Sequence, residues 1–185
     1  MSSSHEPEEL IDIVDEQGVA TGEVVPYGKV HTEGLLHRSA HVWIRNSKGE
    51  ILLQKRSSNK VMYPDHWDAS AAGHVSSGET SVHAAQKETR EELGIELPET
   101  AFTLLATVRS LVQAKQIENE LYDVYVVEQD LLLEELTLDP NEVSDVRWLP
   151  LADFRSWIAG KGELLVAHPE EYVLLLAYLE GQEKL

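Results

Sequence analysis

Residues 73–95 read GHVSSGETSVHAAQKETREELGI, and this stretch decides the fold expected of the chain. Glu88, Glu91 and Glu92 stand three and four positions apart, so a helix would place all three on one face. Like charges this close repel one another unless a cation lies among them. Oxygen ligands in this number suit Mg²⁺ or Mn²⁺ rather than zinc. The alternative is a solvated acidic helix face, which is what most charge runs are.

The residues around these glutamates predict a loop, a helix and a second loop. Thr80 can cap the helix through its hydroxyl, and Gly94 suits a left-handed end. Gly73 and Gly78 bracket the first loop, where glycine permits unusual backbone angles or close approach to a ligand. Positions expected to face the core recur at helical spacing: Val82, Ala85, Thr89 and Leu93.

This stretch resembles the Nudix box, Gly-x5-Glu-x7-Arg-Glu-(apolar)-x-Glu-Glu-x-Gly-(apolar). The matching positions are Gly73, Glu79, Glu88, Glu91, Glu92, Gly94 and Ile95. Lys87 stands where the family has arginine, and Thr89 where it usually has an apolar residue. Lysine keeps the charge but loses the two-pronged grip of arginine on a neighbouring glutamate. The resemblance implies a hydrolase in which Glu79, Glu88, Glu91 and Glu92 hold divalent metal.

Composition limits the classes of protein that remain. The chain has 185 residues, no cysteine and a formal net charge of −18. This length fits one domain, residues 1–185, and the missing cysteine excludes disulfides and thiolate zinc sites. The negative charge disfavours nucleic-acid polymers and anionic membranes as partners. No signal peptide or membrane-spanning apolar run is evident, so a cytoplasmic protein with a small phosphorylated substrate is expected.

Periodicity and turn residues predict the remaining elements. Hairpins are expected at residues 11–14 with 20–25, and at residues 40–45 with 50–56. Further strands are expected at residues 67–72, 102–110, 120–128 and 143–149, and helices at 151–159 and 168–180. The expected parts are a loose tail at 1–9, an N-terminal β extension at 10–36, the box at 73–95 and C-terminal helices at 150–185. The fold class is α/β, a Nudix-type α/β/α sandwich around a mixed sheet.

From Gly28 to Asp145 the chain is also similar to the isopentenyl-diphosphate isomerase branch of the Nudix superfamily. The matching pieces are Lys29-Val30-His31, Leu36-His37, Leu52 to Arg56 with Lys60, Tyr63-Pro64 with Trp67, Gly73-His74 and Glu118-Asn119-Glu120. In these isomerases three histidines and two glutamates hold a divalent metal. The resemblance transfers that role to His31, His37, His74, Glu118 and Glu120.

Imidazole with carboxylate suits Mn²⁺, Fe²⁺ or Zn²⁺ as well as Mg²⁺, so a second divalent metal is expected at this cluster. The alternative is that the histidines are ordinary hydrogen-bonded residues and that the two glutamates lie exposed on an edge strand. The other histidines match nothing in the resemblance and are interpreted as structural or solvent-facing: His5, His41, His66, His83 and His168.

The substrate is expected to bind through basic residues. Arg56 and Lys60 match the residues that grip diphosphate in the isomerases, and their alternative role is to balance nearby acids. Gly73 would let the backbone approach a ligand closely. Trp67 could stack on the substrate or fill the core, and the core is the favoured interpretation.

The position at which the isomerases carry a proton-transferring cysteine is Ala72 in this chain, and no other cysteine exists to replace it. Alanine transfers no proton, so the residues favour hydrolysis of a diphosphate linkage. Metal would neutralise the phosphate oxygens, and Glu91, Glu92 or Glu120 would act as the general base for water. Two alternatives stay open: an isomerase of isoprenoid diphosphates that works without the cysteine, and a non-catalytic module that binds a phosphorylated ligand.

Overall fold

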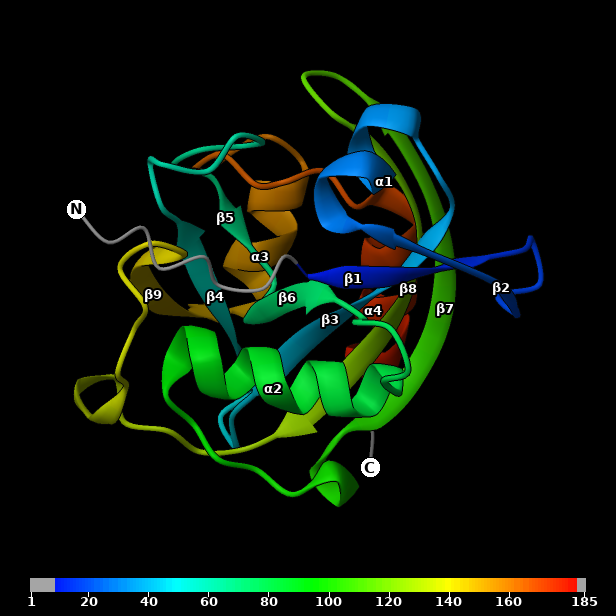
Figure 1. Cartoon of the computed structure of the whole chain (residues 1–185). Coiled ribbons are helices and arrows are strands. Elements are labelled where there is room, and N and C mark those ends of the chain that lie inside the picture. The colour runs from blue at the N-terminus through cyan, green and yellow to red at the C-terminus, as the bar shows by residue number, and fades with distance from the viewer. Residues whose placement is uncertain (1–8, 183–185) are drawn as a thin grey trace, which may run out of the picture.

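Helices cover both faces of a mixed sheet in the structure, a computed structural model that describes residues 9–182 (Figure 1). The strands of this sheet are β3 (His37–Arg45), β4 (Glu50–Arg56), β5 (Trp67–Asp68), β6 (Ala71–His74), β7 (Thr103–Gln113), β8 (Ile117–Glu128) and β9 (Val143–Pro150). Their order is β5-β4-β3-β8-β7, and β6 pairs with β3 while β9 pairs with β4. β3 and β8 run parallel and the remaining pairs antiparallel, which confirms the predicted mixed sheet.

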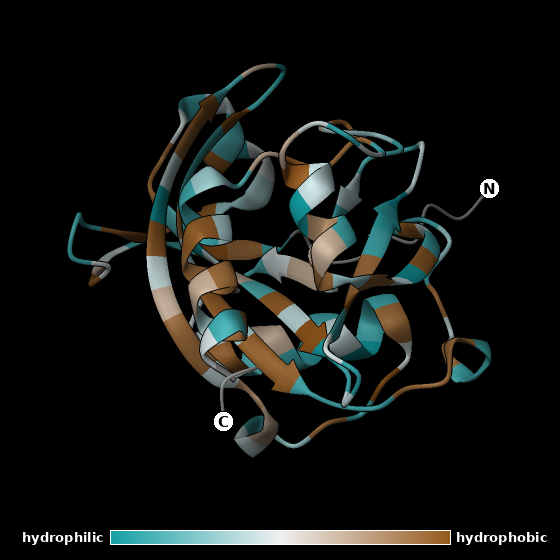
Figure 2. Ribbon diagram, turned by 180° about the vertical axis from the view of Figure 1, so that it is seen from behind, coloured by the Kyte–Doolittle hydropathy of each residue, from teal (hydrophilic) through white to brown (hydrophobic). Residues whose placement is uncertain are grey.

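Alternate residues of β3 pack into two hydrophobic cores, one on each face of the sheet. Val42 and Ile44 pack in the core beneath α2 (Ser81–Leu93). Trp43 faces the opposite core, which includes residues of α3 (Leu151–Ile158) and α4 (Pro169–Gln182). Successive side chains of a strand point to opposite faces, so the part of β3 that is covered on both sides, residues 42–44, is apolar on both. Figure 2 shows these strands as largely hydrophobic and the connecting loops as largely hydrophilic. The predicted α/β/α sandwich is thus confirmed.

The N-terminal region adds a separate two-stranded sheet, β1 (Leu10–Val14) with β2 (Ala20–Pro26), as the hairpin prediction required. The extension is not all β, however, because a helix, α1 (Tyr27–Glu33), follows β2 directly. Pro26 precedes this helix and Gly34 ends it in the left-handed conformation at φ 65°. The predicted tail lies outside the described residues except for Glu9, whose carbonyl accepts the Tyr27 N–H.

The single strand predicted at residues 67–72 is wrong, because the chain changes partner within it. Trp67 in β5 pairs with Lys55 of β4, whereas Ala72 in β6 pairs with His41 of β3. Between them Ser70 accepts the Ile44 N–H at 2.8 Å and donates to the Leu52 carbonyl at 2.6 Å.

Two short 3₁₀ helices, η1 (Glu99–Ala101) and η2 (Leu133–Glu135), lie in loops. None of the described helices is both long and apolar enough to cross a membrane.

Candidate active site

The helix of the box has the predicted ends. The Thr80 hydroxyl oxygen accepts the His83 N–H at 3.3 Å, and Gly94 ends the helix at φ 73°. Ala85, Thr89 and Leu93 are buried as expected, and Val82 packs partly buried against the same core. Local sequence therefore fixes where this helix begins, where it ends and which side faces the sheet.

Two carboxylates of this helix point to the sheet and meet β6. A side chain at Gly73 would collide with Glu88, because a Cβ built there lies 2.2 Å from the Glu88 Cδ. Glu92 is buried, and its Oε2 accepts the Ala72 N–H and the Gln54 side-chain amide, each at 3.0 Å. Burial raises the pKa of Glu88 to about 7 and raises that of Glu92 well above its usual value. A divalent cation between them would favour the ionised forms.

The other two glutamates of the box lie in more polar surroundings. The Glu79 carboxylate is 2.8 Å from His83 Nδ1 and 3.8 Å from Lys87 Nζ. Lys87 Nζ also lies 3.3 Å from the Glu88 carboxylate, so this lysine bridges two box glutamates as a point charge. The Glu91 side chain is 53% exposed and pairs with Arg90 at 3.4 Å. Glu91 thus faces solvent, whereas Glu88 and Glu92 face the sheet.

A cluster of three histidines lies beside the box. His31 comes from α1, His37 from β3 and His74 from β6, and neighbouring ring centroids are 5.1–5.2 Å apart. Glu120 of β8 stands opposite His37 in the parallel register. Its Oε1 lies 3.3 Å from the Nε2 atoms of both His37 and His74. The sheet register therefore brings together residues that are far apart in the sequence.

The atoms of this cluster suit a divalent cation. The Nδ1 atoms of His31 and His37 face the carbonyls of Ile117 and Leu35 at 3.4 Å and 2.9 Å. A carbonyl only accepts, so each Nδ1 carries a hydrogen, and Nε2 is the nitrogen of each ring that could bind a metal ion. The Nε2 atoms of His31, His37 and His74 are buried and have no hydrogen-bond partner among the described residues.

The charge state of the cluster also suits a cation. Burial, together with the neighbouring His74 and His37, lowers the pKa of His31, which keeps that imidazole neutral. Burial alone would raise the pKa of Glu120, but His37 and His74 hold it well below its usual range. Burial and the charge of Glu120 raise the pKa of Glu118. Imidazole nitrogens around an ionised carboxylate are the donor set of a divalent metal site.

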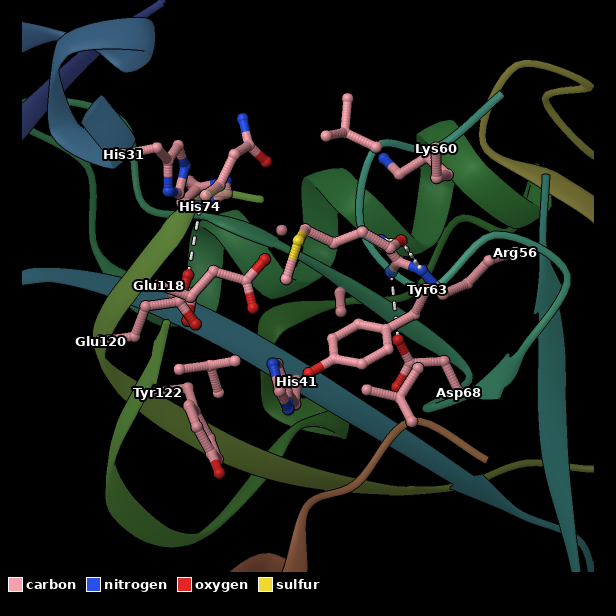
Figure 3. A pocket seen from close by; sticks show the side chains of 18 of the residues that line it. His31, His41, Arg56, Lys60, Tyr63, Asp68, His74, Glu118, Glu120 and Tyr122 are labelled. Carbon is pink, nitrogen blue, oxygen red and sulfur yellow. Dashed lines mark hydrogen bonds and ion pairs between the residues drawn. The ribbon is translucent and has the colours of Figure 1, made fainter. Parts of the chain in front are cut away.

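The cluster and the box open onto one cavity of about 480 Å³ (Figure 3). The predicted site residues that line it are His31, Arg56, Lys60, Gly73, His74, Glu88, Glu118 and Glu120. The guanidinium of Arg56 lies 3.1 Å from Asp68, and Lys60 pairs with Glu142. Two cations and five of the nine expected metal ligands thus face the same space, whereas His37, Glu79, Glu91 and Glu92 do not line it.

Trp67 does not line this cavity. It is 1% exposed, belongs to the core and donates its indole N–H to Glu163 at 2.8 Å. Its position fits the core interpretation and not a stacking contact with a substrate.

Sequence reasoning missed two histidines of the cavity. His41 and His168, interpreted as structural or solvent-facing, both line it, together with Tyr63, Asp68 and Tyr122. One signal was available, because His41 follows His37 by four positions on a strand and therefore shares its face. His168 gave no such signal, since it lies on a loop that tertiary packing brings to the site.

Comparisons with known proteins identify the family of the chain. The NUDIX domain model matches residues 35–167. Nudix hydrolase 3 of Arabidopsis thaliana is 40% identical over 158 residues, which are 82% of this chain but 20% of that protein, so the chain spans about a fifth of its length. An isopentenyl-diphosphate delta-isomerase of Escherichia coli is 31% identical over 78% of this chain and 79% of its own. The crystal structure of DR0079 from Deinococcus radiodurans has a TM-score of 0.68 at 25% identity, covering 94% of this chain and 98% of that one. The chain belongs to the Nudix hydrolase superfamily.

Proposed function

We propose that the protein hydrolyses a diphosphate linkage in a small phosphorylated metabolite with Mg²⁺ or Mn²⁺. One observation carries the proposal: the same cavity is lined by Glu88 of the box, by the basic residues Arg56 and Lys60, and by four members of the histidine–glutamate cluster, His31, His74, Glu118 and Glu120. Nudix enzymes bind small diphosphate substrates and typically depend on divalent metal, and these residues supply both kinds of contact.

The proposal gives each group a role. Arg56 would grip phosphate oxygens through two N–H groups and Lys60 through a single charge. One divalent cation would be held by Glu79, Glu88 and Glu92. A second would be held by His31, His37, His74, Glu118 and Glu120. Glu91 faces solvent and is assigned to neither cation. Bound metal would neutralise the charge on the phosphate oxygens. Of the three candidates for general base, Glu91, Glu92 and Glu120, only Glu120 lines the cavity. We therefore assign to Glu120 the role of the base that accepts a proton from the attacking water.

A turnover screen tests the proposal. Diphosphate compounds are incubated with Mg²⁺ and with Mn²⁺, and products are identified by mass. Glu92→Gln should lower turnover by at least about 10²-fold, because it removes the charge of a metal ligand while keeping its shape. Glu96→Gln, at an exposed position beyond the helix, is the matched control. Unchanged turnover in Glu92→Gln would exclude the box as the metal site.

Isomerisation of an isoprenoid diphosphate is the second candidate, favoured by the histidine cluster and by the likeness to the isomerases. Against it, Ala72 lines the cavity and the chain has no cysteine. We expect no double-bond shift when the protein is incubated with isopentenyl diphosphate, Mg²⁺ and Mn²⁺ in heavy water. Deuterium uptake into the carbon chain without cleavage of the diphosphate would overturn the hydrolase proposal.

A further inference from the structure

Two further histidines lie at the cavity, apart from the three histidines of the metal cluster. His41 projects from β3, and His168 immediately precedes α4. A buried carboxylate holds each ring: His41 Nδ1 is 3.0 Å from Glu171 and His168 Nε2 is 2.9 Å from Asp68. Glu171 is 0% and Asp68 3% exposed, so neither carboxylate can turn to solvent instead.

The two carboxylates of this pair are satisfied without a metal. The other oxygen of Glu171 accepts the Trp43 indole N–H at 2.6 Å, and the other oxygen of Asp68 faces Arg56 at 3.1 Å. No atom of His41, His168, Asp68 or Glu171 is among the buried, unpartnered atoms of the described residues. In the metal cluster, by contrast, the three Nε2 atoms make no hydrogen bond within the described residues, although Glu120 Oε1 lies 3.3 Å from two of them. Both groups have residue types that could hold a metal ion, but in the second group the ring nitrogens His41 Nδ1 and His168 Nε2 are already engaged by carboxylates.

His41 therefore faces the cavity as a donor. Its Nδ1 is engaged by Glu171, which leaves Nε2 as the ring atom that can reach a ligand. Burial would lower its pKa, but the charge of Glu171 raises it to about 9, so the ring is a cation at neutral pH. The ring stacks on Tyr122 with centroids 4.3 Å apart, which fixes its plane. Figure 3 shows His41 across the cavity from His31 and Lys60, with Tyr63 reaching toward it.

A fixed cationic donor is poorly matched to hydrocarbon. A buried donor left without an acceptor costs about 1–3 kcal/mol, and more when it is charged. A cavity of about 480 Å³ is within the range that holds a ligand larger than a diphosphate alone. The organic group of the substrate would then extend from the metals and basic residues toward His41.

We propose that His41, supported by His168, forms a polar subsite in the cavity. This subsite donates a hydrogen bond to an oxygen on the organic group of the substrate. The site therefore selects oxygen-bearing diphosphates over isoprenoid ones. The inference rests on the proposed diphosphate site but not on its catalysing hydrolysis. His41 is the specificity-determining residue, and His168 is a positioning residue that orders Asp68 and the neighbouring ring, whose centroid is 4.9 Å away.

Two probes that share a branched carbon chain test it. Mevalonate 5-diphosphate has the branched five-carbon chain of isopentenyl diphosphate, extended by a carboxylate as its sixth carbon, and it also bears a hydroxyl. Their methylenediphosphonate analogues, in which carbon replaces the bridging oxygen, allow binding to be measured by calorimetry without turnover. We expect wild-type protein with Mg²⁺ to bind the oxygenated analogue at least about 10²-fold more tightly. His41→Gln should reduce that ratio at least about tenfold, leaving the affinity for methylenediphosphonate itself unchanged.

Two further variants keep the outcome decisive. His66→Gln, at a histidine that does not line the cavity, should retain the wild-type ratio. His168→Gln should reduce the ratio in part and leave the bound metal content as in the wild type. Equal affinity of the two analogues for wild-type protein, or loss of one metal equivalent in His168→Gln, would overturn the inference. Selective binding without hydrolysis of any parent diphosphate would instead refute only the proposed function.

Discussion

Gly73 is the point at which β6 and the box helix come closest. Its missing side chain leaves room for Glu88, whose Cδ would lie 2.2 Å from a Cβ at that position. Gly73→Ala should therefore displace the Glu88 carboxylate and lower turnover by about 10²-fold, since a shift of about 1 Å at a reacting centre can cost that much. The variant is assayed for turnover and for metal affinity by calorimetry.

A helical glycine provides the control for this variant. A methyl group added at Gly181 in α4 would meet no atom of the described residues 9–182 within 4 Å, so Gly181→Ala should keep full activity. Wild-type metal affinity in Gly73→Ala would show that Glu88 is not held against β6 as described.

At the scale of residues, sequence predicts those parts of the site that lie in a local pattern. The box residues follow one another on a helix, and their spacing predicted a shared face for Glu88, Glu91 and Glu92. That prediction is correct for Glu88 and Glu92 and wrong for Glu91, whose side chain is 53% exposed. The ring of His41 is different, because its role comes from Glu171, which reaches it only after α4 has packed on the sheet. No spacing in the sequence reports such a partner.

At the scale of elements, the β1–β2 hairpin clamps the loop that precedes the box helix. Asp12 accepts the Ser77 hydroxyl at 2.6 Å and the Gly78 N–H at 3.0 Å, and the Ser77 N–H donates to the Leu10 carbonyl at 2.7 Å. This loop leads directly to Glu79. The hairpin thus helps to position the first carboxylate of the box.

Loss of this clamp should affect catalysis more than stability. Asp12→Ala removes two exposed hydrogen bonds, so the free energy of unfolding should fall by only about 1–2 kcal/mol. Turnover should fall about tenfold because Glu79 becomes less well placed. Urea unfolding and steady-state kinetics measure the two effects, with Glu23→Ala on the exposed β2 as control. An activity loss no larger than that of the control would mean that the hairpin has no positioning role.

Most elements were predicted from local signals, and the two main errors have different causes. Thr80 and Gly94 mark the ends of α2, and the Asn46–Gly49 turn marks the hairpin between β3 and β4. The break between β5 and β6 reflects a change of partner strand, which the residues 67–72 do not encode by themselves. The helix α1 was missed although Pro26 and Gly34 bracket it, because its seven residues are too few for a clear period.

At the scale of the molecule, the His41–Glu171 pair joins the central strand to the C-terminal helix, and it should make stability depend on pH. The pKa of His41 rises from an ordinary 6.5 to about 9 on folding, because Glu171 outweighs the effect of burial. A raised pKa stabilises the fold fully below about pH 6.5, and this contribution disappears as the pH rises through about 9. Its size is on the order of 3 kcal/mol, from about 1.4 kcal/mol for each pKa unit.

Urea unfolding of the wild type and His41→Gln across this range isolates the effect from other titrating groups. The wild type should be more stable than the variant at pH 6, and the difference should shrink toward pH 10. A difference that does not change with pH would show that the ring is neutral in the fold.

The metal cluster depends on the parallel pairing of β3 with β8. Parallel pairing of strands that are distant in the sequence is among the slowest contacts to form during folding. Arg38 and Asp123, which form an ion pair across these strands, lie 85 positions apart in the chain. Closing a loop of that length costs entropy before any contact forms, and parallel strands gain nothing from a local turn. A growing chain that has not yet reached β8 carries the three histidines without Glu118 and Glu120. Metal bound by the full ligand set would therefore hold β3 and β8 together, and its removal would lower the free energy of unfolding of the whole sheet.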